Sequence, residues 1–254
     1  MITRKLVGFD VWTAGARHFK RIQPTLGEEG IELLVVHFGS WGHDPGRPRE
    51  EVIDGVTYRD ISYYRRDSLD SVFSAEAPDG VLVLQSYSLA LELPLLHASS
   101  RAIPTFLLAH GLISAEAGAG PAIVRHVPFG WHIKKLFRRG ATNFAQIVPR
   151  YIRILVTGGF ARVYWFDFAR EVLLRLFKLR LQRYPVAALP DVAMVYTEID
   201  ADAVEGGFRD RGTPEVVVVG NPDFDDFGLQ RGDLGGASRT QAVQEPFVVY
   251  LEAG

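Results

Sequence analysis

Residues 105–111 read TFLLAHG, an apolar run that ends in a histidine and a glycine. The run follows Ile103-Pro104, and a short apolar run after such a turn signal is typical of a buried parallel strand. Ligands of open α/β sheets collect just beyond the carboxyl ends of the strands. We therefore expect His110 and Gly111 to face a binding cleft at the edge of such a sheet.

Similar apolar runs alternate with helical patterns along most of the chain. Strands are predicted at residues 5–11, 31–38, 55–62, 80–85, 105–109, 191–197 and 215–219, and helices at residues 17–29, 68–75, 87–101 and 201–211. Residues 39–50 are rich in Gly, Pro and charge, which favours a loop. The β-α order predicts an α/β protein with a Rossmann-like, doubly wound, mostly parallel sheet.

The composition is that of an ordinary globular protein. The chain has 254 residues, a formal net charge of −2 and no cysteine. The absence of cysteine excludes a disulfide framework and a thiolate metal site. Residues 1–25 carry no signal-peptide pattern, so we expect a cytoplasmic protein.

The charge is distributed unevenly. Residues 123–183 hold 13 of the 28 Lys and Arg residues but only two of the 30 acidic residues, Asp167 and Glu171. A basic block inside an acidic protein indicates a surface that meets an anionic partner.

This basic block forms the predicted helical insert, at about residues 121–185. Its second half, residues 161–184, has the pattern of an amphipathic helix. One hypothesis is that the helix lies on an anionic membrane surface, at the inner face of the cell membrane. The residues expected to face the membrane are Trp165, Phe166, Arg175 and Lys178. The alternative is a helical hairpin that packs on the domain and exposes its charges to water.

A membrane-spanning helix is not expected. The stretch 147–169 has the length, but four charged residues interrupt it. Each would cost about 2.5 to 3.5 kcal/mol at the centre of a bilayer.

A second candidate for chemistry follows the first strand. Gly15 would let the backbone turn closely under a ligand, and Arg17 and His18 begin the next helix, whose N-terminus attracts anions. Histidine takes up a proton near neutral pH, so His18 could act as a base. The alternative is that His18 only caps or packs the first turn of the helix.

Four further residues could bind a polar substrate. Gln85, Ser86 and Tyr87 lie at the end of the strong strand predicted at residues 80–85. Asn221 follows the strand predicted at residues 215–219 and precedes a proline. The alternatives are structural, because Ser86 could cap a helix and Asn221 could hold a turn. His37, His43, His126 and His132 show no metal-ligand spacing, so we expect no metal. No nucleophile elbow, dinucleotide fingerprint or P-loop is present.

The pattern predicts a domain over residues 1–229, a linker over 230–246 and, in residues 247–254, the first strand of a second domain. The linker stretch is polar and Gly-rich, and FVVYL follows it. We interpret the sequence as the N-terminal part of a longer, two-domain protein.

Four stretches together resemble the N-terminal domain of the GT-B glycosyltransferases of bacterial surface-polysaccharide pathways, and the related glycerophosphotransferases and sugar-nucleotide 2-epimerases. These stretches are GFDVWTAGARHFKRIQPTLGEEGIELLVV (8–36), IPTFLLAHG (103–111), VGNPDFDD (219–226) and PFVVYLEAG (246–254). The resemblance covers most of residues 4–254 apart from the basic insert.

The resemblance implies that the chain is the acceptor-binding half of a glycosyltransferase, inactive by itself. A nucleotide sugar would be the donor substrate, held mainly by the C-terminal domain, with no cofactor and no metal. The matching position for the catalytic base is His18, with His110 second. A lipid-linked or glycan acceptor would explain the basic insert, because each Lys or Arg near an anionic leaflet adds roughly 1 kcal/mol of binding.

Two alternatives remain open at this point. One is a sugar-nucleotide 2-epimerase, which needs no membrane surface. The other is a non-catalytic module that binds an anionic polymer. Nucleic acid is not expected as the partner, because large apolar residues interrupt the basic stretch.

Overall fold

The protein, seen here as a computed structural model, is described over residues 4–11, 15–41, 46–84, 89–109, 141–160, 162–177, 189–208 and 214–220. These residues belong to a compact unit that spans Met1–Gly220. The predicted linker and the strand after it lie outside the described residues.

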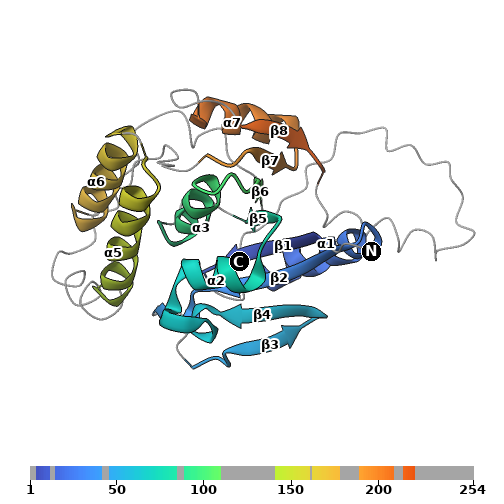
Figure 1. Cartoon of the computed structure of the whole chain (residues 1–254). Helices are drawn as coiled ribbons and strands as arrows, with labels where there is room; N and C mark the ends of the chain where they lie inside the picture. The colour runs from blue at the N-terminus through green and yellow to red at the C-terminus, as the bar shows by residue number, and fades with distance from the viewer. Residues whose placement is uncertain are drawn as a thin grey trace, which may run out of the picture. The chain divides into compact units, whose positions relative to one another are not determined.

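An eight-stranded sheet forms the centre of this unit (Figure 1). The strands are β1 (Arg4–Asp10), β2 (Ile31–His37), β3 (Glu50–Ile53), β4 (Val56–Asp60), β5 (Gly80–Val83), β6 (Thr105–Leu108), β7 (Val192–Val195) and β8 (Glu215–Val218). Their spatial order is β3-β4-β2-β1-β5-β6-β7-β8, and every pair is parallel except β3 with β4. The predicted α/β fold with a mostly parallel sheet is confirmed.

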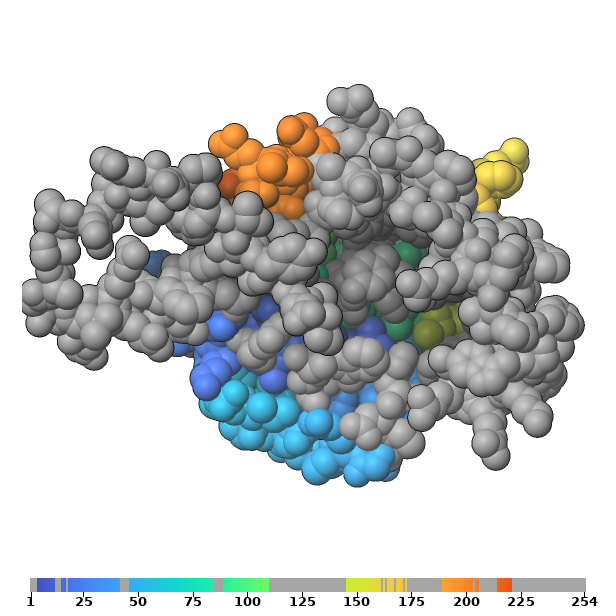
Figure 2. Space-filling view, turned by 180° about the vertical axis from the view of Figure 1, so that it is seen from behind, coloured from blue at the N-terminus to red at the C-terminus, as the bar shows by residue number. Residues whose placement is uncertain are grey.

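The described α-helices are α1 (Ala16–Glu28), α2 (Leu69–Glu76), α3 (Leu89–Ser99), α5 (Ala141–Thr157), α6 (Arg162–Phe177) and α7 (Glu198–Phe208). Short 3-10 helices are η2 (Gly39–Trp41), η3 (Ile61–Tyr63) and η4 (Arg65–Asp67). Figure 2 shows residues of β3 and β4 at one edge of the unit and α7 at the opposite edge, as the strand order requires.

The two faces of the sheet carry different helices. Side chains of β1 alternate between them, so Val7 and Phe9 join one hydrophobic cluster and Leu6 joins the other. The larger cluster contains residues of α2, α3, α5, α6 and α7. The smaller cluster contains Phe19 and Ile22 of α1. Helices on both faces make the sheet doubly wound.

The strand order reverses between β1 and β5. The chain leaves β1 through α1 toward β2, whereas β5 lies on the other side of β1 and continues toward β6. In open α/β sheets, such a switch point opens a crevice beyond the carboxyl ends of the two strands. The β1–α1 connection lies at this point.

One strand differs from the sequence-based expectation. The predicted loop at residues 39–50 ends in β3, which forms a hairpin with β4 around Asp54 and Gly55. Both turn residues have positive φ, 51° and 83°. This is the backbone of the tight two-residue hairpin that Asp-Gly favours, so the Asp-Gly pair was the signal for β3.

The described part of the helical insert consists of α5 and α6, joined by a turn at Gly158 and Gly159. The buried face of α5 packs on the core through Ile147, Tyr151 and Ile154. Tyr151 stacks on Phe168 of α6, with ring centroids 4.5 Å apart. No helix in the described part of the chain is long and apolar enough to cross a membrane.

A buried hydrogen bond joins the insert to the core. The Tyr151 hydroxyl donates to Glu92 Oε2 of α3 at 2.8 Å, and both residues are fully buried. We expect Tyr151→Phe to lower the free energy of unfolding by about 1–3 kcal/mol, because the carboxyl oxygen loses this donor. Chemical denaturation measures the change. Tyr164→Phe is the matched control on α6, and an equal loss in both variants would contradict the assigned role of this bond.

Candidate functional site

The switch point between β1 and β5 begins with a buried carboxylate. Asp10 is the last residue of β1, and its carboxylate accepts hydrogen bonds from the backbone N–H groups of Val11 at 2.7 Å and Gly15 at 3.0 Å. Gly15 is the N-cap residue of α1. Asp10 therefore fixes the turn that leads from β1 into α1.

Gly15 lies in contact with two neighbouring groups. A β-carbon at this position would overlap the Asp10 carboxylate and lie 2.5 Å from a methyl carbon of Leu84, the residue that follows β5. The turn after β1 thus touches the end of β5, which places the two strand ends side by side. The groups that Gly15 approaches belong to the protein itself, and its predicted approach to a ligand stays a prediction.

We expect Gly15→Ala to lower the free energy of unfolding by about 2–3 kcal/mol, because the added methyl overpacks a buried turn and weakens its hydrogen bond to Asp10. Gly27→Ala is the matched control in the same helix. Its β-carbon meets no atom within 4 Å, so it should stabilise the helix by about 0.5–1 kcal/mol. Thermal unfolding of the two variants measures the difference. Equal midpoint temperatures would contradict the close packing assigned to Gly15.

His18 lies in the first turn of α1, next to this turn. The residue is only 6% exposed, so the imidazole is shielded from bulk water. Arg17 belongs to the same turn, and its side chain is not described. The structure therefore places Gly15 and His18 together at the start of α1.

The remaining predicted site residues continue from neighbouring strands. β5 lies beside β1 in the sheet and β6 lies beside β5, both parallel to β1, so residues that directly follow them start at the same edge. Gln85, Ser86, Tyr87, His110, Gly111 and Asn221 themselves lie outside the described residues, as does Lys178. Whether their side chains meet His18 stays a prediction.

The residues predicted to face a membrane differ in exposure. Phe166 is 70% exposed. Trp165 is partly buried and packs against the core cluster. The side chain of Arg175 is not described.

A row of buried polar groups at the same sheet edge was missed by sequence reasoning. Asp10 of β1, His37 of β2 and Asp60 of β4 are neighbours across three strands and are all buried. Each accepts hydrogen bonds from backbone N–H groups of the turns beyond the strands. Their shared position at a strand end was the available signal.

Burial by itself would raise the pKa of Asp60. Hydrogen bonds from Ser40 at 2.9 Å and Ser62 at 2.8 Å outweigh this effect and hold the pKa below its ordinary value. Asp60 is therefore ionised at neutral pH and holds the loop after β2 against the end of β4.

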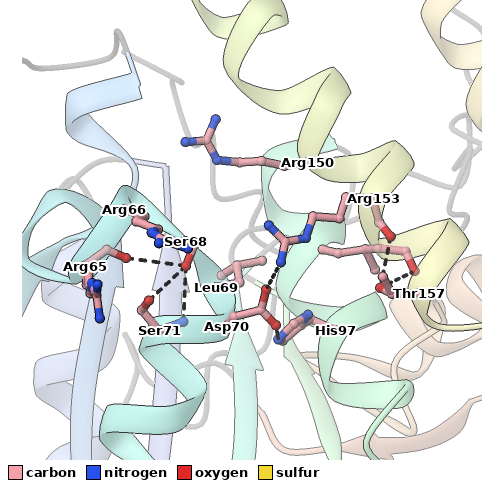
Figure 3. A pocket seen from close by; sticks show the side chains of 11 residues that line it. Arg65, Arg66, Ser68, Leu69, Asp70, Ser71, His97, Arg150, Arg153 and Thr157 are labelled. Carbon is pink, nitrogen blue, oxygen red and sulfur yellow. Dashed lines mark hydrogen bonds and ion pairs between the residues drawn. The ribbon is translucent and has the colours of Figure 1, made fainter.

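A second feature is a cleft of about 340 Å³ between η4, α2, α3 and α5 (Figure 3). We call it the arginine cleft. Its lining consists of Arg65, Arg66, Ser68, Leu69, Asp70, Ser71, His97, Arg150, Arg153, Ile154 and Thr157.

Among the described residues of this lining, Asp70 is the only one with a carboxylate. It accepts a hydrogen bond from Arg101 at 3.0 Å and forms an ion pair with Arg153 at 3.2 Å. These contacts lower its pKa, although burial acts in the opposite direction. His97 Nε2 lies 3.6 Å from the same carboxylate.

Burial, together with the positive charges of Arg101 and Arg153, lowers the pKa of His97 from 6.5 to about 4, although Asp70 acts in the opposite direction. Between those pH values the unfolded chain binds a proton that the folded protein excludes. The free energy of unfolding therefore has its full value above pH 6.5 and decreases as the pH falls toward 4. The titration of His97 accounts for roughly 2–3 kcal/mol of this decrease.

We expect this titration to appear as a difference between the protein and its His97→Asn variant. Asparagine does not titrate, so the stability of the variant should fall less steeply between pH 6.5 and 4. Urea denaturation at a series of pH values gives both curves. Parallel curves would show that His97 contributes nothing to the acid sensitivity.

No protein-family model matches the chain, and no curated protein matches it significantly. Within the described ranges, no group of His, Cys, Asp or Glu side chains could hold a metal ion.

Proposed function

We propose that the chain is the acceptor-binding part of a glycosyltransferase of the GT-B type. It would act with a nucleotide-sugar donor on a glycan or lipid-linked acceptor, at the inner face of the cell membrane. The β1–α1 connection carries this proposal, because it combines the switch point of the sheet, where α/β proteins bind their ligands, with a histidine in the first helical turn. The resemblance of residues 8–36 to the first β-α-β unit of that family supports the same conclusion.

In this proposal, the acceptor hydroxyl enters the crevice beside α1. The His18 ring takes the hydroxyl proton while the oxygen attacks the anomeric carbon of the donor. The bond from that carbon to the nucleotide phosphate breaks, and the nucleotide leaves with the bonding electron pair. Shielding His18 from water would favour the acceptor hydroxyl over hydrolysis of the donor.

The basic insert supports a lipid-linked or otherwise anionic acceptor. Its 13 Lys and Arg residues against two acids would draw the protein to an anionic leaflet. The exposed ring of Phe166 on α6 is suited to entering the interface.

The test uses the protein encoded by the complete gene, a panel of labelled nucleotide sugars and a lipid-linked acceptor in vesicles. Label that moves from the aqueous phase into the lipid or glycan fraction is the expected result. Conversion of the free nucleotide sugar to its 2-epimer without transfer would identify the epimerase instead. Binding of an anionic polymer with neither reaction would identify a non-catalytic module.

A further inference from the structure

The arginine cleft holds more positive than negative charge. Within the described part of the chain, neither Arg66 nor Arg150 has a carboxylate within 4.0 Å, and Arg153 shares Asp70 with Arg101. Figure 3 shows Arg66, Arg150 and Arg153 around the cleft, whereas the guanidinium of Arg65 points away from it. A group with negative charge would balance this excess.

Arg150 is held in place before any ligand binds. Its guanidinium lies over the Trp41 ring at 4.7 Å and donates to the carbonyl oxygens of Gln146 and Asp67. Burial lowers its pKa, with Asp67 acting in the opposite direction. A half-buried cation is stabilised by a bound anion, and a prepositioned one loses little entropy on binding it.

The backbone of η4 brings a second cation to the same cleft. Arg66 and Asp67 both have positive φ, 62° and 46°. Such a conformation costs a residue other than glycine about 1 kcal/mol or more. The turn places the side chain of Arg66 next to Ser68, the N-cap of α2, as Figure 3 shows.

Polar groups on the opposite wall complete the cleft. The hydroxyls of Ser68 and Ser71 lie 3.0 Å apart at the N-terminus of α2, where the helix dipole favours negative charge. His97 is only 6% exposed, and its Nε2 makes no hydrogen bond within the described residues. The Asp70 carboxylate lies 3.6 Å from this nitrogen, beyond hydrogen-bond distance, so the nitrogen is available to an oxygen of a ligand in the cleft.

We propose that the arginine cleft binds a phosphomonoester group, with Arg66, Arg150 and Arg153 as its cationic partners and Ser68, Ser71 and His97 as neutral hydrogen-bond partners. The planar guanidinium group of arginine can donate two parallel hydrogen bonds to two phosphate oxygens. A cleft with several arginines is suited to a doubly charged anion, and less to the single charge of a carboxylate. The helices α2, α3 and α5 that line the cleft pack on the face of the sheet opposite to α1, so this site is separate from His18 and does not rest on the proposed function.

The ligand could be a soluble phosphate ester or the headgroup of a lipid such as phosphatidic acid. Isothermal titration of the full chain with inorganic phosphate and glycerol phosphate tests the first source. Sedimentation with phosphatidic acid vesicles tests the second, with phosphatidylserine vesicles of equal surface charge as the control. The lipid source predicts stronger binding to phosphatidic acid, and the soluble source predicts equal vesicle binding with saturable binding of glycerol phosphate.

The decisive variant is the double change Arg66→Gly and Arg153→Gln. Glycine adopts the positive φ of position 66 without strain, and Arg153 is exposed, so the variant should fold. Each lost arginine should weaken binding roughly tenfold. Arg49→Gln removes an exposed arginine outside the cleft, and it should change binding less than about twofold.

Two results would overturn the proposal. One is the absence of saturable binding by the unchanged protein to inorganic phosphate, glycerol phosphate and phosphatidic acid vesicles alike. The other is equal weakening by Arg49→Gln and by the double variant, which would show a diffuse charge effect. Thermal unfolding of each variant confirms that binding is compared between folded proteins.

Discussion

Glu76→Ala is expected to lower the free energy of unfolding by about 3–5 kcal/mol, the cost of breaking a buried charge network from one side. Glu76 ends α2, and it is buried. Its carboxylate accepts from Arg59 Nη1 at 2.7 Å, from the Tyr64 hydroxyl at 2.9 Å and from Lys5 Nζ at 3.2 Å. These partners join α2 to β1, β4 and the turn before η4.

The partners of Glu76 cannot recover easily once it is removed. Burial and the nearby Glu76 charge raise the pKa of Tyr64, so its hydroxyl stays protonated and needs an acceptor. Arg59 Nε keeps its ion pair with Glu50 at 2.6 Å, but Arg59 Nη1 loses its ion pair with the Glu76 carboxylate. Alanine also leaves an empty volume where the carboxyl was.

The matched control is Glu32→Ala. Glu32 pairs with the same Lys5 at 3.4 Å, but its side chain is 53% exposed. An exposed ion pair contributes about 0–1 kcal/mol, so this variant should stay close to the unchanged protein. Urea denaturation measures both. Similar losses in the two variants would show that Glu76 is an ordinary surface partner rather than the centre of a buried network.

The sequence allowed most of the strands to be predicted because parallel strands buried on both faces leave continuous apolar runs. Residues 31–38, 80–85 and 105–109 are such runs, and each contains a strand. β3 was missed because Glu50 and Glu51 belong to an edge strand, where charge replaces the apolar pattern.

The candidate site was only partly predictable. Gly15 and His18 were predicted as site residues because they follow an apolar run at the start of a helix. Asp10 was missed because one aspartate at a strand end has no spacing that distinguishes it. Its role depends on the close approach of Gly15 and Leu84, which belong to different parts of the chain.

The arginine cleft could not be predicted from local pattern. Arg66, His97 and Arg150 come from segments far apart in the sequence. The packing of α5 against α3 and the hydrogen bond from Arg150 to the Asp67 carbonyl of η4 bring them together. Tyr151 and Glu92 likewise meet 59 residues apart. Periodicity indicated that the insert contains an amphipathic helix, but it could not identify the partner of the apolar face.

His18→Ala is expected to have the largest effect on activity. A positioned general base contributes about 10²–10⁴-fold to a rate, and alanine removes the group that takes the acceptor proton in the proposed mechanism. Lys20→Ala is the control in the same helix. Lys20 is exposed and pairs with Asp54 at 3.4 Å, so its loss should leave the rate within about twofold.

The most direct test of the account is the initial rate of label transfer from a nucleotide sugar to a lipid-linked acceptor. It compares the protein encoded by the complete gene with its His18→Ala and Lys20→Ala variants, after circular dichroism shows all three to be folded. The account predicts transfer by the unchanged protein and by Lys20→Ala, and a rate lower by about 10²–10⁴-fold for His18→Ala. Transfer that is equal in all three would contradict the role of His18, and no transfer from any donor would contradict the glycosyltransferase itself.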